Sequence, residues 1–273
     1  MVKSQSTEQS TPTSTVPILE FDRVGLEYIV DGKPRRIIEE ISLTIQPGEF
    51  VSFVGPSGCG KTSILRMVSG LAPAPIGEVR YHGTKIVKPL KTVGIAFQSP
   101  VLLPWRNIID NVMLPLEVVQ PYKREMKTNK AKLVQTAEEL LIAVGLKDFQ
   151  RQFPWQLSGG MRQRASLCRA LIHQPEILLL DEPFGALDPF TREEMWAMLQ
   201  ELWLRVKCTC ILITHDLREA AFLSDKVYVM APRPSSILYE SQVSLPQPMT
   251  TEMMLSDEFN HLVADLRRHI HRN

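Results

Sequence analysis

Hydrophobic positions along the chain follow two patterns in turn. Residues 50–54 and 177–180 are short continuous apolar runs, as in strands buried on both faces of a parallel sheet. Residues 128–144 instead carry apolar side chains at helical spacing and end at Gly145. Residues 160–173 predict another helix, which stops at Gln174-Pro175. Apolar strands interleaved with helices predict an α/β fold.

Strict alternation of apolar and polar residues is a third pattern, found near the N-terminus. Residues 19–24 alternate and predict an edge strand, and a second alternating stretch, 41–45, ends at a Pro47-Gly48 turn. Asp31-Gly32 is a turn signal between them. Thr191 and Glu194 form a capping box that predicts the start of a helix at 191–206. The other predicted elements are strands at 78–82, 93–97, 210–214 and 227–230, and a helix at 217–223.

Two segments depart from this α/β pattern. Residues 99–121 contain four prolines and predict a loop, so that 99–174 forms a helical insertion. Residues 256–270 predict an amphipathic helix whose last turn is basic. This helix would dock on its own domain or lie on a membrane surface. The residues expected on its apolar face are Leu255, Phe259, Leu262, Leu266 and Ile270.

Composition narrows the class of protein. The chain has 273 residues, 22% of them charged, with a net charge of +1, so nothing pulls it toward nucleic acid or anionic lipid in general. No apolar run approaches the ~20 residues that span a bilayer. Eight of the first sixteen residues are Ser or Thr, which predicts a disordered tail over residues 1–17 and no secretory signal.

The four cysteines do not form a disulfide framework in a chain of this length. Cys208 and Cys210 lie two positions apart on an expected strand, so they would share one face. The two cysteines would either pack in the core or bind a metal ion as a pair, although no second pair of ligands accompanies them. Reduced thiols indicate an intracellular protein.

The strongest chemical signal is the sequence Gly55-Pro56-Ser57-Gly58-Cys59-Gly60-Lys61-Thr62, which has the spacing of a phosphate-binding loop. It follows the apolar run 50–54 and precedes a helical stretch that begins at Ser63. Its glycines let backbone N–H groups curl around anionic oxygens. The helix start adds its positive dipole end. Lys61 would reach the β- and γ-phosphates, and the hydroxyl of Thr62 would hold Mg²⁺.

Two further motifs lie downstream. Asp181 and Glu182 end the apolar run 177–180, at the edge where α/β sheets bind ligands. Asp181 would hold Mg²⁺, and Glu182 would polarise a water molecule against the γ-phosphate. Ser158, Gly159 and Gly160 lie at the start of the helix 160–173. Their local chemistry fits either a second anion site or an ordinary capped helix.

The complete series of motifs resembles the ATP-binding subunit of ATP-binding cassette (ABC) transporters over residues 18–230. The motifs occur in the family's order, and Met161 is a departure, because glutamine is commoner after the two glycines. The residues that carry the resemblance are the phosphate loop, Gln98, 157–160, 179–183, 185–188 and 214–216.

The resemblance implies a P-loop NTPase (RecA-like) core with an antiparallel β subdomain and an inserted α-helical subdomain. It implies an ATP-binding domain at 18–240, a helical subdomain at about 99–174 and a C-terminal extension at 241–273. Glu182 would be the general base, His215 the switch histidine, and Gln98 the lid residue that contacts Mg²⁺ and water. Asp188 would lie at a dimer contact. Tyr28 would stack on adenine or, alternatively, be an ordinary strand aromatic.

In this family two ATP-binding subunits pair head to tail, so Ser158 and Gly160 of one would close on the γ-phosphate at Lys61 of the other. Transmembrane permease subunits would be direct partners and a solute-binding protein an indirect one. The implied place is the cytoplasmic face of the bacterial inner membrane. Leu102, Leu103 and Trp105 would either contact the permease or cover the subdomain's core.

Finer resemblances point to importers of nitrate, sulfonates, taurine and related anions. They are the runs 102–105 and 184–188 with Thr191-Arg192, and Val229-Met230 followed by 232–234. We therefore expect an ATPase that couples ATP binding and hydrolysis to uptake of a small anion. The alternative is the ATPase subunit of another ABC system, an exporter or an importer of an unrelated solute.

Overall fold

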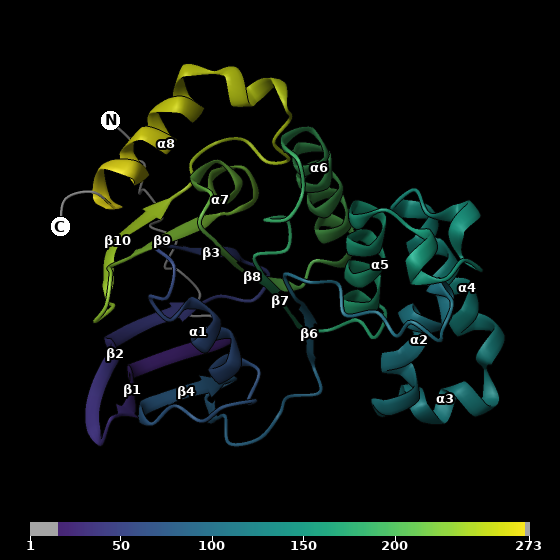
Figure 1. The fold of residues 1–273 in the computed structure, drawn as a ribbon, viewed down its shortest axis with the longest axis horizontal. Helices are drawn as coiled ribbons and strands as arrows, with labels where there is room; N and C mark the ends of the chain where they lie inside the picture. The colour runs from purple at the N-terminus through teal and green to yellow at the C-terminus, as the bar shows by residue number, and fades with distance from the viewer. Residues whose placement is uncertain (1–15, 271–273) are drawn as a thin grey trace, which may run out of the picture.

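The structure is a computed structural model, and it describes residues 16–270. Two β-sheets organise it, with helices on the remaining faces (Figure 1). The strands are β1 (Leu19–Val30), β2 (Lys33–Ile45), β3 (Phe50–Val54), β4 (Ile76–Tyr81), β5 (Thr84–Lys85), β6 (Val93–Ala96), β7 (Ile177–Asp181), β8 (Thr209–Thr214), β9 (Lys226–Met230) and β10 (Ile237–Gln242). The helices are α1 (Lys61–Val68), α2 (Ile108–Val118), α3 (Tyr122–Thr128), α4 (Lys130–Ala143), α5 (Gly159–Leu171), α6 (Pro189–Val206), α7 (Leu217–Leu223) and α8 (Asp257–Ile270).

The larger sheet has the order β10-β9-β3-β8-β7-β6, and all its strands except β10 run parallel. Side chains of β3 alternate between two hydrophobic cores. Val51 and Phe53 pack with α1 and the smaller sheet, whereas Phe50 and Val54 pack with the helices on the other face. Burial on both faces explains why the strand is a continuous apolar run. The expected α/β fold is therefore confirmed.

The smaller sheet is antiparallel, with the order β2-β1-β4-β5. Its first strand was expected at an edge, and this was wrong, because β1 pairs with both β2 and β4. Alternation reports that one face of a strand is buried and the other exposed, which inner strands of an antiparallel sheet also show. The expected turn at Asp31-Gly32 joins β1 to β2.

Residues 99–174 contain α2, α3, α4 and α5, which lie together at one side of the molecule (Figure 1). The loop expected over 99–121 was wrong in part, because α2 begins at Ile108 and continues through Pro115. Asn107 caps it by accepting a hydrogen bond from the amide of Asp110 at 2.9 Å. The buried side of α2 carries the apolar side chains that hold the helix in place.

Two other boundaries needed correction. The helix expected from Thr191 begins at Pro189, because Asp188 rather than Thr191 is the cap, accepting from the amide of Thr191 at 3.1 Å. In the C-terminal segment Leu255 is 81% exposed and lies before α8. Val263, which the pattern omitted, is buried instead.

Helix α8 docks on its own domain, as one of the two alternatives predicted. It lies against α7, β9 and β10 (Figure 1). Phe259, Val263 and Leu266 are its buried residues. Across residues 16–270, the structure has no helix whose length and apolar character would let it span a membrane. The disordered tail predicted at 1–17 falls almost wholly outside the described residues.

Candidate functional site

The phosphate loop joins the C-terminal end of β3 to the first turn of α1. Lys61 is only 5% exposed, and its Nζ donates to the carbonyl oxygens of Gly55 at 2.8 Å and Pro56 at 3.1 Å. The ammonium group is therefore held inside the curve of the loop. Gly60 occupies the N-cap position of α1 and supplies no side-chain hydrogen bond. The first amides of the helix remain available to an anion.

The backbone at Gly60 explains why this position must be glycine. Its φ of 104° lies in the left-handed region, and a Cβ there would stand 2.9 Å from Cγ1 of Ile38. Cys59, one position earlier, is 1% exposed, and burial raises the pKa of its thiol. Its side chain therefore packs against the core rather than toward a ligand.

Asp181 lies beside the loop, at the end of β7. Thr62 Oγ1 donates to Asp181 Oδ1 across 3.1 Å, so two oxygen atoms suited to a hard cation stand next to each other. Burial and the neighbouring charge of Glu182 raise the pKa of Asp181, against the opposing hydrogen bond from Thr62 and the charge of Lys61. A cation bound here would reverse that balance and keep the carboxylate ionised.

Glu182 follows in a left-handed backbone conformation, with φ of 44°. Its Oε2 lies 3.2 Å from Nδ1 of His215, which follows β8. Gln98 approaches from the segment after β6, because a Cβ built on Gly185 would be 3.8 Å both from Gln98 Nε2 and from Glu182 Oε2. Glutamate, histidine and glutamine thus lie together at the carboxyl edge of the parallel sheet.

Glu182 and the phosphate loop border a cavity of about 260 Å³. Tyr28 from β1 lies on its rim and is half exposed, as a base-stacking aromatic needs to be. Sequence reasoning missed two lining residues, Ile37 and Arg233, and the Nε of Arg233 donates to the carbonyl of Gly58 in the loop. The only sequence signal for Arg233 was its position after the predicted strand 227–230. The remaining lining residues are Ser57, Gly58, Gly60, Lys61, Thr62 and Ser63.

The second predicted site lies at the start of α5. Ser158 caps this helix, accepting from the amide of Met161 at 3.3 Å. Together with Gly159, Gly160 and Asp188 it lines a separate hollow of about 420 Å³. No residue lines both this hollow and the cavity at the phosphate loop. One copy of the chain therefore has two separate hollows, one at the phosphate loop and one at the start of α5.

A hydrogen-bond bridge that the sequence did not predict connects the two sites. Arg192 donates to the carbonyl of Leu187, beside the second hollow, at 3.1 Å and to Asp216 Oδ2 at 3.2 Å. Asp216 follows His215 and caps α7. The side chain of Arg192 is only 25% exposed, which favours a fixed connection.

Glu219 supports the turn that carries His215 from the protein interior. It is buried, and Thr214 Oγ1 donates to its Oε2 and accepts from the amide of Asp216 at 3.0 Å. Burial raises the pKa of Glu219 to about 8. The residues on either side of His215 are thus anchored in the protein interior.

The cysteine pair lies in the hydrophobic core. Cys208 and Cys210 are both buried in the core, and no cluster of three potential metal ligands occurs within residues 16–270. Core packing is the alternative that the structure supports.

A glycine loop at a strand end, a buried lysine and a carboxylate pair at the neighbouring strand define a P-loop nucleotide-binding protein. The family model described as ABC transporter matches residues 38–185, and the chain belongs to this family. The family predicted from the motifs is confirmed. The chain binds nucleotide and is an ATPase that works as a transporter subunit.

Known relatives agree over most of the chain. It is 41% identical to the taurine import ATP-binding protein TauB of Escherichia coli K12, over 81% of this chain and 82% of that protein. For the protein of the same name in Pseudomonas fluorescens Pf0-1, identity is 40%, over 81% and 80%.

Among solved structures, the fold is similar to the bacterial ABC transporter cassette MJ0796. Two dimeric structures of that protein, one of them bound to ADP and Pi, match with a TM-score of 0.69 and 28% identity. They cover 84% of this chain and all of that one.

Proposed function

We propose that this chain powers the uptake of a small anion, with a sulfonate such as taurine as the foremost candidate. The observation that carries the proposal is the 40–41% identity to taurine import ATP-binding proteins over about four fifths of each chain. The residues at the phosphate loop support the ATPase half of the proposal. The domain division expected above, with residues 18–240 as the ATP-binding domain, belongs to the same proposal.

Mg²⁺ would be held by Thr62 and Asp181, with Gln98 beside them. The fit rests on the 3.1 Å contact between two oxygen atoms, Thr62 Oγ1 and Asp181 Oδ1, next to the buried ammonium of Lys61. When bound, the ion neutralises charge on the β- and γ-phosphates. Lys61 and the amides of α1 orient the same phosphates, and Tyr28 covers the base.

Glu182 would act as the general base. Its carboxylate lies past Asp181 at the cavity edge, so it can take a proton from a water molecule aligned with the γ-phosphate. His215 would orient that carboxylate through Nδ1, which lies 3.2 Å from it, and its imidazole would contact the γ-phosphate through the other ring nitrogen. Gln98 would hold the water from the other side, since its amide lies near Glu182 at Gly185.

Two copies would complete the site head to tail. Support comes from the separation of the two hollows in one copy and from the dimeric structures of the MJ0796 cassette. In such a dimer Ser158, Gly159 and Gly160 would face the γ-phosphate held by the other copy's Lys61, and Asp188 would lie at the contact. The dipole of α5 then has an anion to stabilise.

Contact with permease subunits would use the segment before α2. Trp105 is 72% exposed while Leu102 is buried, so Leu102 covers the core and Trp105 does not. An exposed tryptophan on a rigid segment is a common anchor at protein interfaces. This assembly would place the chain at the cytoplasmic face of the bacterial inner membrane, with a solute-binding protein as an indirect partner.

The proposal is tested by purifying the chain with its native permease subunits and measuring ATP-driven uptake in proteoliposomes. We expect uptake of taurine or an alkanesulfonate, and a Trp105→Ala variant that keeps ATPase activity in the isolated chain but loses uptake. Uptake of nitrate alone would change the assigned substrate but keep the same class of importer. ATP-dependent transport in the opposite direction, or transport of an unrelated solute only, would refute the proposal.

A further inference from the structure

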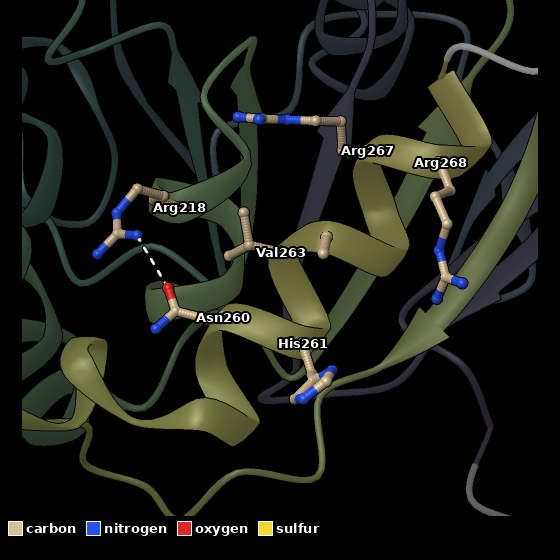
Figure 2. Close-up of a pocket in the computed structure, with 7 residues that line it drawn as sticks. Arg218, Asn260, His261, Val263, Arg267 and Arg268 are labelled. Carbon is tan, nitrogen blue, oxygen red and sulfur yellow. Dashed lines mark hydrogen bonds between the residues drawn. The ribbon is translucent and has the colours of Figure 1, made fainter.

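A hollow of about 830 Å³ lies between α7 and α8, far along the chain from the phosphate loop. Figure 2 shows its lining, in which Arg267 from the last turns of α8 extends toward the side of that helix where α7 and Arg218 lie. Neither ATP binding nor hydrolysis, as described above, makes use of this groove. Its lining residues are Arg218, Asn260, His261, Val263, Ala264, Arg267 and Arg268.

The groove is cationic, and none of its lining residues in the described part of the chain is acidic. Arg268 is the one lining arginine with a carboxylate partner, Asp265, at 2.8 Å. Within residues 16–270, Arg267 has no hydrogen-bond or ion-pair partner. Its guanidinium, with donors arranged in a fork, therefore remains free to bind a carboxylate.

The guanidinium of Arg218 is fixed in position, but its positive charge is still available to a ligand. Its guanidinium donates to Asn260 Oδ1 at 3.5 Å and to the carbonyl of Met254 at 3.3 Å, and it lies 5.1 Å from the ring centroid of Phe259. All three of these partners are uncharged, so its positive charge is not compensated by them. A fixed guanidinium loses little side-chain entropy when it binds an anion.

The shape of the groove suits an extended ligand. Its lining positions on α8 run from 260 to 268, about 12 Å at a rise of ~1.5 Å per residue. That length matches about four residues of extended peptide, at ~3.3 Å each. Val263 and Ala264 give it an apolar floor between the charged walls. A flat lipid surface would fit such a hollow less well.

We propose that the α7–α8 groove is a docking site for an acidic peptide segment of a partner protein, with Arg218, Arg267 and His261 binding its carboxylates. The chain's own N-terminal residues 1–15 do not match this chemistry, because their sequence holds one acidic residue, Glu8. Arg218 lies in the first turn of α7, and its amide donates to Asp216 Oδ1 at 2.9 Å. The docked segment therefore lies against the turn that carries His215.

The test uses the full chain with excess ADP, which fills the phosphate loop, and a fluorescein-labelled hexaglutamate peptide followed by anisotropy. We expect saturable binding that weakens as salt is raised, and at least tenfold weaker binding for Arg267→Glu. Hexaglutamine is the peptide control. Arg205→Glu is the matched protein control, because Arg205 is also an exposed arginine in the last turn of a helix, α6.

Folding of each variant is checked by thermal melting, and His261→Ala gives a second, smaller change in the groove. Equal binding by Arg267→Glu and the wild type, or equal binding of hexaglutamine, would overturn the proposal. Binding to vesicles with 30% phosphatidylserine that depends on Arg267, without hexaglutamate binding, would replace the peptide by a membrane. Self-association that depends on Arg267, again without peptide binding, would replace it by a second copy.

Discussion

The phosphate loop and the loop at residues 157–160 are made of similar parts but are held differently. Each places glycines at the start of a helix. The first helix, α1, begins at a glycine without a side-chain cap, and the lysine beside it is buried. The second, α5, is capped by its own Ser158, which is exposed. The first loop is therefore ready for a phosphate by itself, whereas the second is stable without a ligand and offers its surface outward.

This difference predicts which changes disturb binding and which disturb turnover. Glu182→Gln removes the proposed base but leaves the loop intact. We expect turnover to fall about 1,000-fold, within the ~10²–10⁴ range for general-base catalysis, with ATP affinity unchanged. Phosphate release and nucleotide binding would be measured separately, with Glu201→Gln on α6 as control. A wild-type rate in Glu182→Gln would assign the base elsewhere.

A change in the other loop tests whether it serves a second copy. Ser158→Arg places a long charged side chain at the exposed helix start, so we expect turnover to fall about 100-fold through misplacement of the closing surface. ATP binding to the isolated chain should persist. Ser158→Ala, which loses the cap at a cost of about 1 kcal/mol but adds no bulk, separates capping from obstruction. Normal turnover by Ser158→Arg would argue against a shared site.

The connection between the two regions can also be broken. Arg192→Ala removes the hydrogen bonds to Leu187 and Asp216, so the turn with His215 loses a support. We expect a loss of about 1.5–3 kcal/mol in the free energy of unfolding and a roughly tenfold slower turnover. Denaturant unfolding and ATPase assays measure the two effects, and Arg205→Ala serves as control. If unfolding is affected but turnover is not, Arg192 has a structural role only.

The last expected effect concerns Glu219, and it appears only in the pH dependence of stability, with no expected effect on turnover. Its folded pKa of about 8 exceeds its ordinary value of 4.5, so the folded state holds a proton that the unfolded state has lost. Stability should therefore decrease as pH rises through this window, by up to ~1.4 kcal/mol per pH unit. Glu219→Gln keeps the acceptor for Thr214 but removes the titration. Denaturation between pH 5 and 8 should give a flatter profile for the variant; parallel profiles would contradict the buried proton.

Sequence patterns found the elements that are buried on both sides. The strands at Phe50–Val54 and Ile177–Asp181 are apolar throughout because both faces meet a core, and their ends carry the phosphate loop and the carboxylates. Position after a buried strand indicated Glu182, and the resemblance to the ABC family added Gln98 and His215; the structure has all three at one edge, where the carboxyl ends of parallel strands meet. Position after a strand is a local signal that does not depend on distant contacts.

Elements whose stability depends on tertiary contacts were missed. Helix α2 contains Pro115, which local rules interpret as a breaker, but Asn111 is buried and binds the carbonyls of Leu103, Arg106 and Asn107, which fixes the chain around it. The bridge at Arg192 joins two segments that are distant in sequence, and no spacing rule connects them. Asp188 was expected only at a dimer contact, while its capping role depended on where α6 begins.

The cysteines of this chain have a practical consequence. All four are buried, and burial raises the pKa of Cys168 to about 12 and that of Cys208 to about 11. Thiol reagents act on the exposed thiolate, so the native chain should react slowly. A single cysteine introduced at Trp105 or His261 would then be the reactive handle on the wild-type background. Site-directed cross-linkers placed there could capture neighbouring subunits and show directly which protein each surface touches.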